Sequence, residues 1–246
     1  MLFSLTNEQF WGATMIDFRF ERVELNDPRI NELYALRYQV YCTECGFESP
    51  DDHSGGLETD EYDAHSRHFC AMVADTGQVI GTVRIILASS EGLPRGQLPI
   101  EWHCALNPQD RFTGNRNEIA EISRLAISKD FRRREIDKAI YAESEVDFLE
   151  ACQLNEKRRQ FEGLIVAGLY QCIYQESLSL KLTHWYAVMV RGLCGLLRRW
   201  GVTWKQVGDQ VEYHGVRVPY LANIAENADR AALLNPLLLE KPSGWK

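Results

Sequence analysis

The sequence predicts a mixed α/β or α+β fold in which helices flank one central sheet. Segments with the residue pattern of strands are interspersed with segments that have the apolar periodicity of helices. Hydrophobic residues make up 45% of the chain and charged residues 25%, so it can bury a sizeable core and disorder is not expected. The 246 residues fit one large domain or two small ones, and we predict a single domain over residues 1–246.

Six segments are expected to form strands and four to form helices. Alternating residues or short apolar runs predict strands at residues 14–25, 69–74, 79–87, 118–128, 185–190 and 207–218. Apolar residues that recur every three or four positions predict helices at residues 26–41, 161–173, 193–200 and 222–235. Pro28 suits a first helical turn, Gly46 and Gly201 end helices, and Asp75-Thr76-Gly77-Gln78 predicts a hairpin turn.

Three connecting segments are long. Residues 48–65 form an acidic, turn-rich loop, and residues 88–117 form a polar loop with three prolines. Residues 131–160 are highly charged, and we expect them to be a helical insertion at the surface. Because long loops in compact domains often carry functional residues, the acidic loop is a candidate part of a site.

Composition argues against several classes of protein. The net charge of −8 argues against a general nucleic-acid binder. No apolar run approaches the ~20 residues of a membrane span, and no signal peptide is visible, so we expect no transmembrane segment and a cytoplasmic location. Seven cysteines, an odd number, indicate reduced thiols. Cys42-x-x-Cys45 lacks a second ligand pair at zinc spacing, so we expect no metal site.

The stretch Glu121-Ile122-Ser123-Arg124 is the most informative part of the chain. It places three polar groups in a predicted apolar strand, where each costs free energy if it is buried unpaired. In an ideal strand Glu121 and Ser123 face one side and Arg124 the other, and a β-bulge would turn one of them toward a cleft. Glu121 is the best candidate for a general base, and the alternative is a structural Glu–Arg pair.

Three further motifs precede this strand. Arg37-x-x-Val40-Tyr41 lies on the first predicted helix, where an arginine is more often solvated than functional. Glu58-x-Asp60-x-Tyr62-Asp63 lies in the acidic loop and could bind a cation or an amine, or could simply be solvated. Arg84 lies within an apolar strand, so it must face solvent or pair with a carboxylate.

Together these motifs resemble the LuxI-type N-acyl-homoserine-lactone synthases of the GNAT superfamily. The residues that match are Arg37, Val40, Tyr41, Phe47, Glu58, Asp60, Tyr62, Asp63, Arg84, Glu121, Ser123 and Arg124. A closer resemblance is to the PEP-CTERM/exosortase-associated acyltransferases and the N-acyl amino acid synthases. It rests on residues 36–42, 121–124 and 131–134 and on Tyr213-x-Gly215-x-Arg217-Val218-Pro219-Tyr220.

The resemblance implies a GNAT-like fold with a central mixed sheet, splayed to admit an acyl chain. It implies transfer of a long acyl chain from acyl carrier protein or acyl-CoA to the amine of an amino acid or related small molecule, without a bound cofactor. Carried over by position, Glu121 would be the base or would orient the nucleophile, with Ser123 and Arg124 as further catalytic residues. Arg84 and Arg124 would fix the acidic loop or the substrate carboxylate. The residues expected to bind substrate are Arg37, Phe47, Asp60, Asp63 and Arg84.

The segment after this strand departs from the usual GNAT pattern. Residues 132–135 contain no glycine, so they offer fewer backbone N–H groups to a phosphate than a glycine-rich loop does. The cluster Arg132, Arg133 and Arg134 is instead expected to bind phosphopantetheine and the acidic surface of a carrier protein.

Two other functions are considered. One is an N-acyl-homoserine-lactone synthase that uses S-adenosylmethionine, although Phe47 stands where those synthases usually carry Trp. The other is a non-catalytic GNAT-like module that binds an acyl carrier or a lipid.

Overall fold

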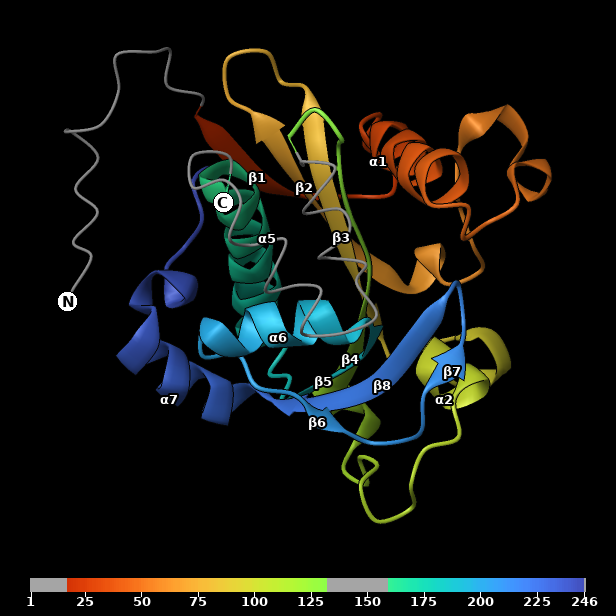
Figure 1. Cartoon of the computed structure of the whole chain (residues 1–246), viewed down its shortest axis with the longest axis vertical. Helices are drawn as coiled ribbons and strands as arrows, with labels where there is room; N and C mark the ends of the chain where they lie inside the picture. The colour runs from red at the N-terminus through yellow and green to blue at the C-terminus, as the bar shows by residue number, and fades with distance from the viewer. Residues whose placement is uncertain (1–16, 132–158, 246) are drawn as a thin grey trace.

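A computed structural model describes residues 17–131 and 159–245 and is built around one sheet (Figure 1). The eight strands have the order β1-β2-β3-β4-β5-β8-β6, with β7 paired to β8. Their bounds are β1 Phe18–Val23, β2 Ser66–Val73, β3 Val79–Leu87, β4 Ile119–Ile127, β5 His184–Met189, β6 Lys205–Gln206, β7 Val211–Glu212 and β8 Val216–Asn223. The mixed α/β architecture predicted from the sequence is confirmed, and it is GNAT-like.

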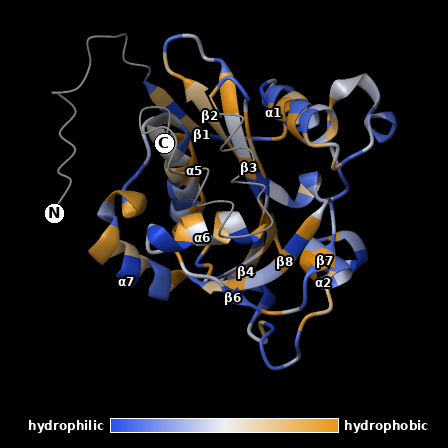
Figure 2. Cartoon of the chain, in the orientation of Figure 1, coloured by the Kyte–Doolittle hydropathy of each residue, from blue (hydrophilic) through white to orange (hydrophobic). Residues whose placement is uncertain are grey.

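Helices cover both faces of the sheet. Their bounds are α1 Ile30–Tyr38, α2 Pro99–His103, α5 Arg159–Ser179, α6 Arg191–Arg199 and α7 Ile224–Leu234. Side chains alternate along β2, so that Phe69 packs in the core with residues of α5, α6 and α7, whereas Cys70 packs with α1. The segments rich in hydrophobic residues therefore lie along the sheet and the helices, while most loops are hydrophilic (Figure 2).

The sheet opens between β4 and β5. These two strands are parallel, and their register runs from Ile119 opposite His184 to Ile122 opposite Ala187. Beyond Ile122, β4 remains paired with β3 and β5 remains paired with β8, but β4 and β5 no longer pair with each other. The two halves of the sheet thus diverge, and this is the splay that the resemblance implied.

A β-bulge interrupts β4 at this opening. Thr82 of β3 lies opposite Ala126, and Arg84 lies opposite Ser123, so Val83 faces both Arg124 and Leu125. Arg124 has a φ of 55°, a left-handed backbone conformation that is uncommon for a residue with a side chain. The extra residue turns the Arg124 side chain away from the side expected in a regular strand.

Most expected elements are confirmed with small changes of boundary, and two expectations are wrong. The last long strand is β8 and not residues 207–218, which hold the short β7, turns and only the first three residues of β8. Pro219 explains why β8 was not predicted. Proline has no backbone N–H group to donate within a sheet, so its presence in a sequence argues against a central strand. The predicted loop 88–117 contains α2, whose five residues are too few to give a helical pattern.

The helical insertion expected at 131–160 lies almost entirely outside the described residues, whereas the predicted C-terminal helix is confirmed as α7. Within the part of the chain that the structure describes, no helix is long and apolar enough to cross a membrane. Of the cysteines in the described ranges, all six are outside disulfides. Among the described residues no group of three or more His, Cys, Asp or Glu side chains could hold a metal ion.

Candidate active site

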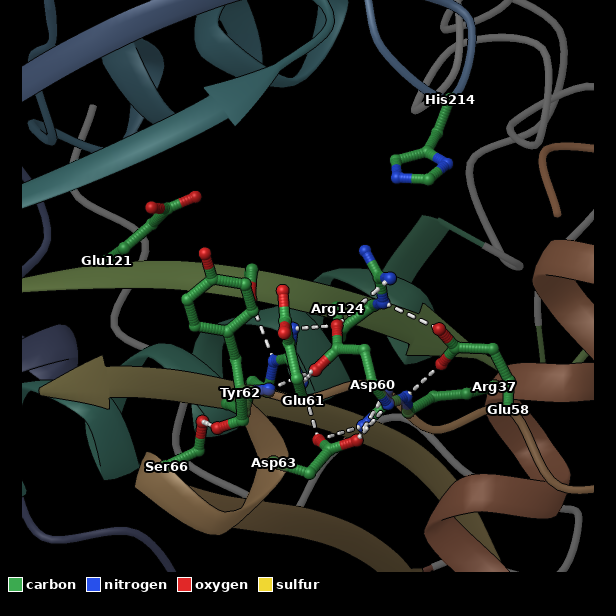
Figure 3. Close-up of polar contacts among 12 residues, drawn as sticks. Arg37, Glu58, Asp60, Glu61, Tyr62, Asp63, Ser66, Glu121, Arg124 and His214 are labelled. Atoms are coloured by element: carbon green, nitrogen blue, oxygen red, sulfur yellow. Dashed lines mark hydrogen bonds and ion pairs between the residues drawn. The ribbon is translucent and has the colours of Figure 1, made fainter. Parts of the chain in front are cut away.

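Three arginines and four carboxylates form a buried network on the face of the sheet covered by α1 (Figure 3). The arginines come from three elements far apart in the sequence: Arg37 from α1, Arg84 from β3 and Arg124 from β4. All four carboxylates come from the loop that follows α1, and they are Glu48, Glu58, Asp60 and Asp63. The network thus attaches the acidic loop to the sheet.

Arg84 is the centre of the network. Its Nη1 and Nη2 atoms each lie 2.6 Å from an oxygen of Asp60, and Nη1 lies 2.5 Å from Asp63 Oδ1. Its Nε donates to Ser123 Oγ at 3.0 Å, which ties the network to β4. Arg37 donates to Asp63 Oδ1 at 2.6 Å and also to Glu58, so the two guanidiniums share Asp63.

The bulge brings Arg124 into the same network. Its Nε donates to Glu58 Oε1 at 2.9 Å and its Nη2 to Glu48 Oε1 at 3.0 Å, while Asp60 Oδ2 lies 3.2 Å away. The structural Glu121–Arg124 pair considered as an alternative is therefore wrong, because Arg124 pairs with the acidic loop.

Three of the four loop carboxylates are held in the ionised form, whereas burial raises the pKa of Glu48. Burial alone would raise the pKa values of Glu58, Asp60 and Asp63, but the adjacent guanidiniums outweigh it and hold all three pKa values below their usual range. Carboxylates of this kind are poor proton acceptors at neutral pH, so they act here as structural anions.

The segment after α1 positions Tyr41 at the bulge. Residues Gln39–Glu44 form a π-helix, in which the Cys45 N–H bonds the carbonyl of Val40, and such wide turns are frequent at functional sites. The Tyr41 hydroxyl donates to the carbonyl of Leu125 at 2.7 Å. Burial raises the pKa of Tyr41 to about 12, so it remains a donor.

Glu121 stands apart from this network (Figure 3). Its side chain is nearly fully buried, with 2% of the residue exposed, and its Oε2 accepts the backbone N–H of Ile100 in α2 at 2.9 Å. Burial is the main cause of a pKa of about 8, because this hydrogen bond and the more distant arginines compensate only in part. Glu121 is the carboxylate best suited to accept a proton near neutral pH.

A cavity passes through the opening between β4 and β5. Its walls have different chemistry on the two faces of the sheet. The polar part is lined by Arg84, Glu121, Ser123, Arg124, Tyr213, His214 and Arg217. The apolar part, formed largely by α5 and α6, is lined by Val166, Leu169, Tyr170, Ile173, Leu193 and Leu197.

The turn between β7 and β8 closes over the polar part of this cavity. His214 Nδ1 lies 3.1 Å from Glu48 Oε1 and 3.3 Å from the carbonyl of Phe47, so the turn contacts the start of the acidic loop. Arg217 stacks over the Phe47 ring, with 4.6 Å from Cζ to the ring centroid. Tyr213 stacks on His103 of α2 at 4.3 Å between ring centroids.

The structure brings together most of the predicted site residues but gives them different positions. Arg84, Glu121, Ser123 and Arg124 line the cavity. Arg37, Asp60 and Asp63 lie behind Arg84 and Arg124 within the ion-pair network, and Phe47 lies beneath Arg217. Arg132, Arg133 and Arg134 fall outside the described residues.

Sequence reasoning missed Glu48, Tyr213, His214 and Arg217 as site residues. Tyr213 and Arg217 belong to a motif used for the resemblance, which was the available signal. Nothing in the spacing shows that this motif would fold over a loop that begins 167 residues earlier in the chain.

Comparison with known proteins agrees with this geometry. Residues 36–142 match the family model of the acetyltransferase (GNAT) domain, a range that begins in the last turn of α1 and includes the acidic loop, β2, β3 and β4. Residues 36–142 are thus similar to a GNAT acetyltransferase domain, and the enzyme class that this match supports is N-acyltransferase. No curated protein matches the sequence of this acyltransferase.

Solved structures with the same fold include three acyl-transferring synthases. The AHL synthase LasI has a TM-score of 0.57 and 18% identity, over 91% of this chain and 96% of that one. The CoA-dependent acyl-homoserine lactone synthase BjaI, solved with SAM and isopentyl-CoA, has a TM-score of 0.59 and 14% sequence identity, over 94% of this chain and 93% of that one. FeeM, an N-acyl amino acid synthase from uncultured soil microbes, has a TM-score of 0.51 and 13% sequence identity, over 89% of this chain and 98% of that one.

Proposed function

We propose that this acyltransferase moves a long acyl chain from a thioester donor to the amine of an amino acid or related small molecule. The observation that carries the proposal is the single cavity that contains Glu121, a carboxylate with a pKa near 8, beside an apolar compartment. The apolar side chains of α5 and α6 suit an alkyl chain, and Glu121 suits an amine that must lose a proton.

The reaction would take place in the opening between β4 and β5. The acceptor amine attacks the thioester carbonyl carbon, its proton passes to Glu121, and a C–N bond forms as the carbonyl oxygen becomes an oxyanion. Backbone N–H groups at the bulge near Arg124 and Leu125 would stabilise this oxyanion. The C–S bond then breaks, and the thiolate takes the proton back from Glu121, which restores the enzyme.

In this scheme the acidic loop takes no part in proton transfer and instead holds the wall of the cavity in place. Asp60 and Asp63 hold Arg84, and Arg84 holds Ser123, so the network fixes β4 on the side of the cavity where the amine enters. Arg37 and Phe47 support the same wall from the first helix and its following loop.

Acyl carrier protein and acyl-CoA are both proposed donors, and both present the thioester on a phosphopantetheine arm. The role of Arg132, Arg133 and Arg134 in binding this arm or the carrier protein remains a prediction, as does an association with PEP-CTERM/exosortase systems.

The test is a reconstituted transfer assay. The purified enzyme is incubated with palmitoyl-acyl carrier protein or palmitoyl-CoA and an equimolar mixture of the proteinogenic amino acids. Thiol release and N-acyl products are followed by mass spectrometry. We expect thiol release that depends on an acceptor, with stoichiometric N-acyl product. Thiol release without an N-acyl product would contradict the proposal.

A second candidate function is synthesis of N-acyl-homoserine lactone from S-adenosylmethionine. It is favoured by the fold shared with LasI and BjaI. Replacing the amino acids by S-adenosylmethionine in the same assay separates the two, since only this function yields an acyl lactone and methylthioadenosine.

A further inference from the structure

The apolar part of the cavity contains two polar groups without a hydrogen-bond partner among the described residues. Tyr170 of α5 lines this part and is only 6% exposed, and its hydroxyl makes no hydrogen bond within the part of the chain that the structure describes. Trp204, which follows α6, also lines the cavity, and its Nε1 atom is buried without a partner. A buried polar group that lacks a partner costs free energy, so its presence needs an explanation.

Nearby aromatic residues of the same types have partners within the protein. The indole Nε1 of Trp185 donates to Ser177 Oγ at 2.8 Å, and the hydroxyl of Tyr186 accepts a backbone N–H at 2.6 Å. Buried tyrosine and tryptophan side chains usually find such partners. Tyr170 and Trp204 differ in that both line the cavity, where a bound molecule can supply the missing partner.

Tyr170 and Trp204 both pack beside the ring of Trp185. The Tyr170 ring meets it edge-on at 5.5 Å between ring centroids, and the Trp204 ring lies 6.3 Å from it. Burial raises the pKa of Tyr170, so its hydroxyl keeps its proton and can donate. An indole N–H can only donate. The group that satisfies both is therefore an acceptor such as an oxygen atom.

This region lies across the sheet from Glu121. Glu121 accepts the N–H of Ile100, which belongs to the hydrophobic cluster around α2. Tyr170 and Trp185 belong to the core formed with α5 and α6 on the opposite face. An acyl chain whose thioester lies beside Glu121 must pass through the opening of the sheet before it reaches Tyr170. An oxygen on the third carbon, only two bonds from the carbonyl carbon, stays on the Glu121 side.

We infer that the acyl chain of the donor carries an oxygen atom, in a hydroxyl or keto group beyond its third carbon, that accepts a hydrogen bond from Tyr170. The inference rests on the proposed function, because the apolar compartment must hold the acyl chain. The N–H of Trp204 is the second donor, and one oxygen has lone pairs for both. An unsubstituted chain leaves both donors unpaired, whereas an oxygenated chain pairs them. Tyr170 thus determines donor specificity.

The experiment compares palmitoyl thioesters with hydroxypalmitoyl thioesters that carry the hydroxyl at the third carbon or at successive carbons toward the methyl end. The acceptor is the best one found in the transfer assay. For wild type we expect kcat/KM for one distal isomer to be about tenfold higher than for palmitoyl, and kcat/KM for the third-carbon isomer to be within about twofold of palmitoyl. In Tyr170→Phe the distal preference should fall to about twofold or less, because phenylalanine keeps the ring but lacks the hydroxyl.

Tyr174→Phe is the matched control, because Tyr174 lies one turn later on α5 and is not among the residues that line the cavity. It should keep the wild-type preference. Taking the ratio of two donors within one protein cancels any general loss of activity. Thermal unfolding should show Tyr170→Phe to be at least as stable as wild type, since the hydroxyl that it loses has no partner.

If Tyr170→Phe is inactive with every donor, Trp204→Phe tests the same ratio, which should also fall. Equal kcat/KM of wild type for palmitoyl and every hydroxypalmitoyl isomer would overturn the inference. A distal preference that persists unchanged in Tyr170→Phe would overturn it as well.

Binding without turnover separates this inference from the proposed function. Isothermal titration calorimetry measures the affinity of wild type and Tyr170→Phe for free palmitate and the free hydroxypalmitates. Tighter binding of a distal hydroxypalmitate, lost in Tyr170→Phe, supports the inference even if no donor yields an N-acyl product, a result that would overturn the proposed function. Transfer of every acyl chain at the same rate would overturn the inference and leave the acyltransferase reaction intact.

Discussion

Glu121 and the acidic loop present two opposite environments for a buried carboxylate on the same side of one sheet. Glu58, Asp60 and Asp63 are surrounded by guanidiniums, and their pKa values are lowered. Glu121 has one backbone N–H donor, and its pKa is raised to about 8. The comparison teaches that guanidiniums can outweigh the effect of burial on the pKa of a carboxylate, so we assign the network as a scaffold and Glu121 as the proposed base.

Removing the cation at the centre of the network is expected to have the largest effect. Arg84→Met leaves Asp60 and Asp63 without their main partner, and an uncompensated buried charge costs about 3–5 kcal/mol. Urea unfolding measures this loss, with Arg116→Met, which breaks a more exposed pair with Glu101, as a control that changes stability by less than about 1 kcal/mol. Equal stability of the two variants would mean that the network is not the scaffold.

Removing the base should affect the reaction and not the fold. Glu121→Gln keeps an oxygen for the Ile100 N–H but cannot accept the amine proton, so we expect the rate of acyl transfer to fall about 10³-fold, or about 4 kcal/mol of activation free energy. Thermal unfolding should show an intact fold. Glu212→Gln, an exposed change in β7, is the matched control and should retain full activity. Full activity of Glu121→Gln would exclude this residue as the base.

The pH dependence should report the raised pKa of Glu121. A base is active when it is deprotonated, so kcat/KM should fall about tenfold for each pH unit below about 8. Dividing wild-type rates by those of Glu121→Gln at each pH removes the ionisation of the acceptor amine. A ratio that stays constant from pH 6 to 9 would contradict the assignment, whereas a step near pH 8 would support it.

The smallest effect is expected at the bulge itself. Tyr41→Phe leaves the partly buried carbonyl of Leu125 without the hydroxyl donor that lies 2.7 Å away, which costs about 1 kcal/mol of stability. Because Leu125 belongs to the bulge proposed to stabilise the oxyanion, we also expect kcat to fall severalfold while the acceptor KM changes little. Tyr38→Phe, at the end of α1 and three residues before Tyr41, is the control. A change in the acceptor KM alone would place Tyr41 in substrate binding.

Much of the fold could be predicted from the sequence, because the spacing of apolar residues is local information. The hairpin of β2 and β3, the strand β4 and the helices α1 and α5 lie close to where the periodicity predicts them. Strand β8 was misplaced because Pro219 argues against a strand locally, although its carbonyl still accepts the Val207 N–H in the folded chain. The short α2, which supplies the donor to Glu121, gives no periodic signal.

The sequence by itself determined the class of fold, the order of the motifs and the unusual presence of Glu121, Ser123 and Arg124 in one apolar strand. Only the tertiary structure decided what each of them does. The bulge turns Arg124 to the acidic loop 66 residues earlier, and Glu121 is left with a single backbone donor. The physical reason is that the ionisation of a buried group depends on charges and solvent exclusion supplied by residues distant in the sequence, and folding alone brings these together.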